Sequence, residues 1–127
     1  MKYLLDTNVA LWFFNGDDKF STNTLACIDN QANAKFISIA SAWEIAIKIC
    51  KGTLRFDGGV SCFFDAVSAY GFSILPVNEQ YVKIIETLPL HHRDPFDRII
   101  IATAIAENMA IISSDDVFRK YAVKLVL

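Results

Sequence analysis

Short apolar stretches alternate along the chain with longer segments that mix apolar and polar residues. The apolar stretches predict strands at residues 2–6, 36–40, 72–77, 110–113 and 123–126. The segments between them predict helices at residues 8–15, 22–30, 41–52, 60–70, 79–88, 95–108 and 116–121. Ser21, Ser41, Asn78 and Asp94 stand where helix N-caps are expected, and Pro95 occupies the first helical position after Asp94.

This alternation of strands and helices predicts an α/β fold with a mainly parallel central sheet flanked by helices on both faces. The 127 residues suit a single domain spanning 1–127. Apolar residues make up 54% of the chain and charged residues 20%, which indicates a packed core. In such sheets the functional crevice lies at the carboxyl ends of the strands.

The cysteine content and the length of the apolar runs indicate the compartment in which the protein is expected. Cys27, Cys50 and Cys62 are odd in number and form no CxxC pair, which argues against a disulfide framework or a zinc knuckle. No apolar run approaches the roughly 18 residues that a membrane span needs, and the N-terminus reaches Asp6 too soon for a signal peptide. We therefore expect a cytoplasmic protein that does not associate with membranes.

The net charge of −2 is not typical of a nucleic-acid-binding protein, although it permits a local basic patch. Several basic residues lie close in sequence to acids considered below and are candidates for RNA binding. They are Lys48, Lys51, Arg55, Arg93 and Arg98. Their alternative role is a solvated surface, and Lys48 can simply pair with Glu44 one helical turn away.

Acidic residues cluster where strands end and helices begin. Asp6 ends the first predicted strand, Glu44 lies in the first turn after the second, Asp94 and Asp97 open a late helix, and Asp115 follows the fourth strand. Because these positions share one edge of a parallel sheet, the carboxylates can meet there. Carboxylate ligands suit Mg²⁺ or Mn²⁺, and such a cluster is suited to metal-assisted hydrolysis of a phosphodiester.

Each acid except Asp6 also has a purely structural interpretation. Ser41 and Glu44 fit a capping box, Asp94 and Asp115 fit N-caps, and Asp97 at the third helical position complements the helix dipole. Asp6 ends an apolar strand and is not needed as a cap, and its expected burial favours a functional role.

Four segments resemble the motifs of PIN-domain ribonucleases, in order and at family spacing. The segments are Leu4-Leu5-Asp6-Thr7-Asn8, residues 41–48, residues 92–102 and residues 113–118. The third has the form H-R-D-P-F-D-R that a subgroup of VapC-like toxins carries. The resemblance implies a PIN-like fold and a Mg²⁺- or Mn²⁺-dependent endoribonuclease that is the toxin of a toxin–antitoxin pair.

The resemblance also implies roles for individual residues. Asp6, Glu44, Asp97 and Asp115 match the catalytic, metal-binding acids of the family. Thr7 and Asn8 would orient Asp6 or a bound water, and Ser113 keeps the hydroxyl of a position that is often Thr. Asp94 matches an extra acid of the subgroup and Asp116 an outer acid, although a helix cap and a solvated side chain are the simpler roles.

The family implies a homodimer, a cognate antitoxin and an RNA substrate. The run Val9 to Phe14 would be apolar on every side of its helix, so it is either part of the core or an interface. His91 and His92 are expected in a loop, with phosphate or RNA contact as the second interpretation. Receiver and phosphatase folds fit poorly because Asp6 lacks a paired acid, which leaves a non-catalytic RNA- or protein-binding PIN-like module as the alternative.

Overall fold

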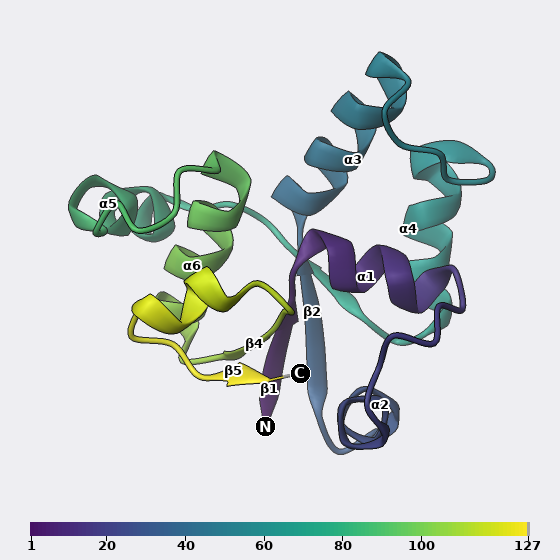
Figure 1. The fold of residues 1–127 in the computed structure, drawn as a ribbon, viewed down its shortest axis with the longest axis horizontal. Coiled ribbons are helices and arrows are strands. Elements are labelled where there is room, and N and C mark those ends of the chain that lie inside the picture. The colour runs from purple at the N-terminus through teal and green to yellow at the C-terminus, as the bar shows by residue number, and fades with distance from the viewer. Residues whose placement is uncertain (127) are drawn as a thin grey trace.

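A single five-stranded sheet forms the centre of the computed structural model, which describes residues 1–126 (Figure 1). Its order is β3-β2-β1-β4-β5, and all four neighbouring pairs are parallel. The strands are β1 (Lys2–Leu5), β2 (Ala34–Ser38), β3 (Ser73–Leu75), β4 (Ala110–Ile112) and β5 (Leu125–Val126). In the register, Leu5 at the end of β1 lies beside Ile37 of β2 and Ile112 of β4, so these strands finish at the same edge.

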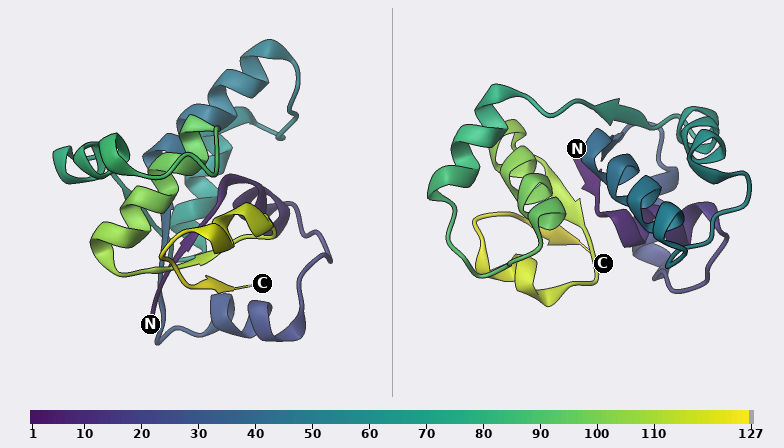
Figure 2. Two further views of the ribbon diagram at one scale, coloured as in Figure 1. Left: turned by 60° about the vertical axis from the view of Figure 1, so that its left-hand side comes forward. Right: turned by 90° about the horizontal axis from the view of Figure 1, so that it is seen from above.

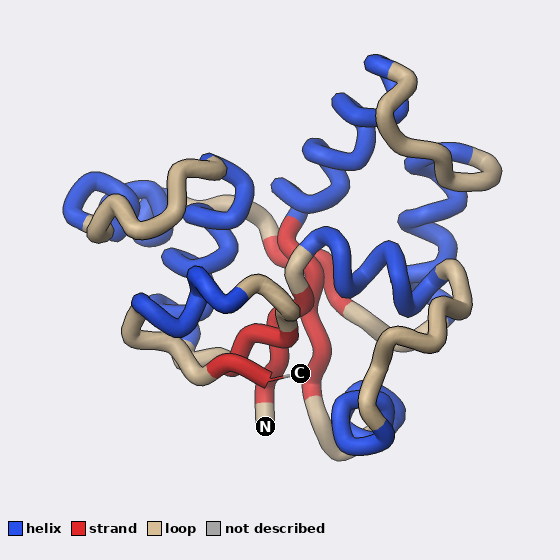
Figure 3. The backbone as a smooth tube through the Cα atoms, in the orientation of Figure 1, coloured by secondary structure: helices blue, strands red, loops and turns tan. Residues whose placement is uncertain are grey.

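Helices cover both faces of this sheet, which confirms the predicted α/β fold (Figures 1 and 2). They are α1 (Thr7–Phe14), α2 (Thr22–Asp29), α3 (Ile39–Lys51), α4 (Gly59–Ala69), α5 (Glu79–Thr87), α6 (Pro95–Glu107) and the short 3₁₀ helix η1 (Asp116–Lys120). With the strands at the centre, α1, α2 and α4 lie on one side, and α5, α6 and η1 lie on the other (Figure 3). Helix α3 packs against α1 and α4 and also against α6.

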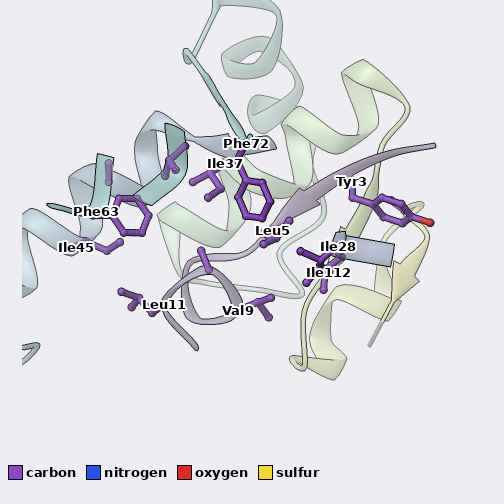
Figure 4. Packing of buried hydrophobic residues seen from close by; sticks show 14 residues of the cluster. Tyr3, Leu5, Val9, Leu11, Ile28, Ile37, Ile45, Phe63, Phe72 and Ile112 are labelled. Carbon is purple, nitrogen blue, oxygen red and sulfur yellow. The ribbon is translucent and has the colours of Figure 1, made fainter. Parts of the chain in front are cut away.

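Alternation along β1 and β4 divides the core between the two faces. Leu5 and Ile112 pack with α1, α3 and α4 in one cluster (Figure 4), whereas Leu4 and Ile111 pack against α6 and η1 in another. Successive strand residues point to opposite faces, and both faces are covered, so β4 is apolar throughout and β1 is apolar from Tyr3 onward. This is why the strands could be recognised as short apolar runs.

The apolar run Val9–Phe14 of α1 packs against the core. Val9, Ala10 and Leu11 are buried, and the ring of Phe13 stacks on Phe72 with centroids 5.6 Å apart. Of the two predictions for this helix, a place in the core therefore accounts for most of its apolar surface.

The start of α3 differs from the prediction. The helix begins at Ile39, because the Ser38 hydroxyl accepts the backbone N–H of Ala40 (3.1 Å) and acts as the N-cap. Ser41 lies inside the helix and is fully buried. Glu44 is therefore in the second turn, and the predicted capping box of Ser41 and Glu44 does not form.

Two features of residues 1–126 concern the cysteines and the helices. Cys27, Cys50 and Cys62 are all free thiols. None of the described helices combines the length and the apolar character required to cross a membrane.

Candidate metal-binding active site

Asp6 lies at the junction between β1 and α1, at the carboxyl edge of the sheet. Its Oδ1 accepts the backbone N–H of Val9 (2.7 Å), so it caps α1, contrary to the expectation that Asp6 has no capping role. Its Oδ2 accepts the Ser113 hydroxyl. Burial raises the pKa of Asp6, these two hydrogen bonds lower it, and the charges of Asp115 and Glu44 raise it further.

Ser113 connects the ends of β1 and β4. While its hydroxyl donates to Asp6, its oxygen accepts the backbone N–H of Asp115 (3.0 Å). Ser113 thus supports two of the predicted site acids, in agreement with a role for the hydroxyl at this position. The side chain is fully buried and can therefore hold a fixed orientation.

Thr7 and Asn8 make no hydrogen bond to Asp6 in the described structure, and the alternative that they orient a bound water stays a prediction. The Thr7 hydroxyl is buried and donates to Ser41 Oγ (3.0 Å), so it joins α1 to α3. Asn8 is exposed in the first turn of α1. The orienting groups for Asp6 are instead the Val9 amide and Ser113.

Glu44 points its carboxylate into the protein from the second turn of α3. Its Oε2 lies 3.0 Å from Lys48 Nζ, which confirms the ion pair expected one turn apart. Its Oε1 is the single buried side-chain oxygen or nitrogen within residues 1–126 that has no hydrogen-bond partner. A buried carboxylate oxygen without a donor is costly unless a cation approaches it.

Asp97 and Asp115 converge on His92. The His92 Nε2 lies 3.0 Å from Asp97 Oδ2 and 2.9 Å from Asp115 Oδ2. Within residues 1–126 these three side chains form the one group whose potential ligand atoms all lie within 4.8 Å of one another. Asp6 and Glu44 stand outside that group, so the four predicted acids are neighbours without a single close four-way cluster.

The four acids nevertheless act on one another electrostatically. The pKa of Asp97 is raised to about 7, chiefly by burial and also by the charges of Asp94, Asp6 and Glu44, while His92 opposes the rise. Carboxylates that resist joint ionisation in this way are stabilised by a bound cation. The orphaned Glu44 oxygen and the all-carboxylate character of the acids fit a hard divalent ion such as Mg²⁺ or Mn²⁺.

Asp94 and Asp116 take the structural roles that were the simpler alternatives. Asp94 caps α6, since its Oδ1 accepts the N–H groups of Phe96 (2.8 Å) and Asp97 (3.4 Å). Asp116 is exposed and pairs with Arg119 at 3.0 Å. Asp115 combines both kinds of role, because its Oδ1 also caps η1 through the Val117 amide (3.0 Å).

Arg98 is a buried structural residue and not an RNA contact, which corrects its assignment. Its guanidinium donates to the carbonyl oxygens of Pro89 (2.8 Å), Leu88 (3.0 Å) and His92 (3.2 Å). With 8% of its surface exposed, it has no face left for a phosphate. Instead it fixes the loop that carries His92.

His92 is a site residue whose ring contacts the sequence did not indicate. It lies in a loop, as predicted, but its ring lies between two site acids. The available signal was its position two residues before the Asp94 cap, which brings it next to the first turn of α6. Its contact with Asp115, 23 residues later, could not be read from spacing.

A hollow of about 590 Å³ opens beside Glu44. Lys48 and Lys51 of α3 line one part of it, and Arg93 and Phe96 line another. We call it the basic hollow. Lys51 and Arg93 are exposed; Arg55 is also exposed but does not line this hollow.

The sequence of the chain matches a known protein family. A profile of the PIN domain family matches residues 3–124, and the chain belongs to that family. Compared by sequence alone, it matches no curated protein significantly.

Solved structures with a similar fold include toxin–antitoxin proteins. VapBC2 from Rickettsia felis, bound to a DNA fragment from its promoter, aligns with a TM-score of 0.73 at 18% identity over 99% of this chain and 98% of that one. VapBC-1 from nontypeable Haemophilus influenzae gives 0.72 at 19% identity over 99% and 97%. A toxin–antitoxin complex from Klebsiella pneumoniae gives 0.67 at 20% identity over 98% and 96%. At these identities the likeness establishes the fold.

Proposed function

We propose that this PIN domain is a divalent-metal-dependent endoribonuclease and the toxin of a toxin–antitoxin pair. The observation that carries the proposal is the buried Glu44 Oε1, which has no partner and stands beside three further acids at the carboxyl edge of the sheet. Membership of the PIN family and the likeness to toxin–antitoxin structures support it.

Asp6, Glu44, Asp97 and Asp115 would hold Mg²⁺ or Mn²⁺. When bound, the ion would lower the pKa of the attacking water and would offset the negative charge that develops on the phosphate. Ser113 keeps Asp6 and the Asp115 backbone in register, and Lys48 offsets the charge of Glu44. No nucleophilic side chain is required.

The basic hollow is the proposed path of the RNA strand. Lys48, Lys51 and Arg93 would contact phosphates, while Phe96 offers an apolar face to a base. Unpaired RNA fits this arrangement because its bases are free to leave the helical stack. Arg55 would act at the margin of this path.

The proposed protein partners are a cognate antitoxin and a second copy of the chain. Structures with this fold have been determined as toxin–antitoxin complexes, which supports the antitoxin. The homodimer is supported by an apolar groove of about 530 Å³ between α3 and α6, which we assign as its interface. The groove is lined mainly by Ile39, Trp43, Val77, Phe96 and Ile99. We further propose that the chain acts as a single domain in the cytoplasm.

The deciding experiment is cleavage of a total-RNA pool by antitoxin-free protein, with Mg²⁺, with Mn²⁺ and with chelator. Asp6→Asn should lower the rate of cleavage about 100-fold or more, because an amide is a poor replacement for a carboxylate ligand. It should leave the fold intact, since Asn is also a good N-cap. Asp116→Asn is the matched control, with the same charge change at an exposed acid, and should cleave normally.

Metal-dependent fragments that disappear in Asp6→Asn alone would support the enzyme. Cleavage retained by Asp6→Asn would refute the assigned role of Asp6. A folded wild-type protein that binds RNA or antitoxin yet cleaves nothing would favour the non-catalytic PIN-like module.

A further inference from the structure

His92 is fixed by a partner at each of its polar groups. Its backbone N–H donates to Tyr121 Oη (2.7 Å), and its carbonyl oxygen accepts from the Arg98 guanidinium (3.2 Å). The imidazole ring lies 5.6 Å from the ring of the fully buried Phe118. A ring held on its backbone and on one face in this way cannot swing freely out of the acid site.

The hydrogen bonds of the ring define its tautomer. The backbone N–H of Asp94 donates to His92 Nδ1 at 3.2 Å, so Nδ1 must present a lone pair. A neutral imidazole carries its proton on the other nitrogen, which here is Nε2. Nε2 therefore faces Asp97 Oδ2 and Asp115 Oδ2 as an N–H donor, at 3.0 and 2.9 Å.

We propose that His92 is a positioning residue, whose Asp94-locked Nε2–H bridges Asp97 and Asp115 and holds both carboxylates in place for the divalent ion without itself binding it. This inference rests on the proposed function, since it assumes that these acids hold a metal. It also gives Asp94 a role beyond capping α6: its backbone amide selects the tautomer of His92.

The arrangement also bears on which ion the site accepts. The cluster of one histidine and two aspartates has the spacing of a mixed nitrogen and oxygen site, which suits zinc. A protonated Nε2 has no lone pair to offer, so the available ligand atoms are carboxylate oxygens. Oxygen ligands favour Mg²⁺ and Mn²⁺.

The first test is the nitrogen NMR spectrum of the metal-free protein with ¹⁵N-labelled histidine. The chain has two histidines, and His91→Gln assigns their signals. We expect His92 in the Nε2–H form, with its resonances unchanged in character when Mg²⁺ is added. An Nδ1–H form, or a shift of Nε2 that indicates coordination, would overturn the proposal.

The second test is Mn²⁺ affinity, measured by calorimetry on the whole chain. His92→Phe keeps a ring against Phe118 but removes the donor, and should weaken binding about 10-fold or more. His92→Gln, which can place an N–H near the same point, should restore most of the affinity, and His91→Gln should match the wild type.

The outcomes separate this inference from the proposed function. Tight Mn²⁺ binding by wild type and equally tight binding by His92→Phe would refute the positioning role and leave the nuclease standing. Wild-type protein that binds neither Mn²⁺ nor Mg²⁺ would refute the proposed function itself.

Discussion

The pKa of Asp97 reflects the close approach of several negative charges at the site. Burial and neighbouring carboxylates raise its pKa from 3.8 to about 7. The folded chain therefore binds more protons than the unfolded chain between those two values, so its stability decreases as pH rises through that range. Above the upper value the full penalty applies whenever the metal is absent.

Asp97→Asn should remove this penalty. In chelator at about pH 8, we expect the melting temperature of the variant to exceed that of the wild type by roughly 2–5 °C. The decrease in stability between about pH 4 and 7 should become shallower. Thermal unfolding across this pH range measures both effects.

Asp116→Asn serves as the control for Asp97→Asn, because Asp116 is exposed. Its pH profile should follow that of the wild type. If Asp97→Asn also followed the wild-type profile, the charge crowding assigned to Asp97 would be wrong.

At this scale the sequence predicted which acids gather, but not how each is held. Strand ends and helix starts are visible in the pattern, and they placed Asp6, Asp97 and Asp115 at one edge. The contact of Thr7 with Ser41 and that of Ser113 with Asp6 join residues 34 and 107 positions apart. Contacts of that kind depend on tertiary packing, which a single sequence does not reveal.

The junction between α5 and α6 depends on one arginine. Arg98 lies in the first turns of α6, and its guanidinium reaches carbonyl groups at the end of α5, including Leu88 (3.0 Å) and Ile85 (3.4 Å). The Ile85 carbonyl also accepts the backbone N–H of Leu88 (3.2 Å), and Leu88 itself is the C-cap residue of α5. The arginine thereby joins the two helices and the loop that bears His92.

Arg98→Met should therefore destabilise the fold by roughly 3 kcal/mol, because the Leu88 and His92 carbonyls would lose the donor that Arg98 supplies. Urea unfolding gives the change. Arg93→Met is the matched control: Arg93 is exposed, so its stability should stay within about 0.5 kcal/mol of the wild type.

The same two variants separate an arginine that stabilises the fold from one that is proposed to bind RNA. Arg93→Met should weaken RNA binding and reduce its salt slope by about 1, as expected for one lost phosphate contact. Folded Arg98→Met should keep the wild-type slope. The reverse pattern would overturn the assignment of both arginines.

Element boundaries show why the capping box was misassigned. Ser38 and Ser41 are three residues apart, and either can cap a helix, while Ile39 and Ala40 look like the end of an apolar strand. In the fold Ser38 takes the cap because Ser41 is buried against Thr7. The shift moves Glu44 one turn inward and frees its carboxylate for the site.

For the whole molecule, the parallel sheet explains why residues from distant segments meet. The parallel direction of the strands followed from the alternation of strands and helices, and the structure confirms it, whereas the strand order was not predicted. Surfaces were harder to predict. The groove that contains Trp43, which has 64% of its surface exposed, forms only when α3 and α6 pack side by side.

Trp43→Glu should weaken self-association by about 10-fold or more if this groove is the dimer interface, since buried tryptophans dominate interface energetics. Analytical ultracentrifugation over a concentration series measures the dissociation constant. Leu90→Glu, at an isolated and highly exposed position, should have no effect. Equal dimerisation by Trp43→Glu and wild type would exclude the groove as the interface.

Pro95 and Phe96 line both the apolar groove and the basic hollow, and Asp97 is the next residue along the chain. The wall shared by the two hollows therefore leads directly into the acid site. If the proposed metal site is correct, a small apolar compound in the groove would contact Pro95 and Phe96 at the first turn of α6 without competing for the ion. This offers a route to inhibitors that avoid chelating groups, and with them the poor selectivity that chelators show among metal-dependent enzymes.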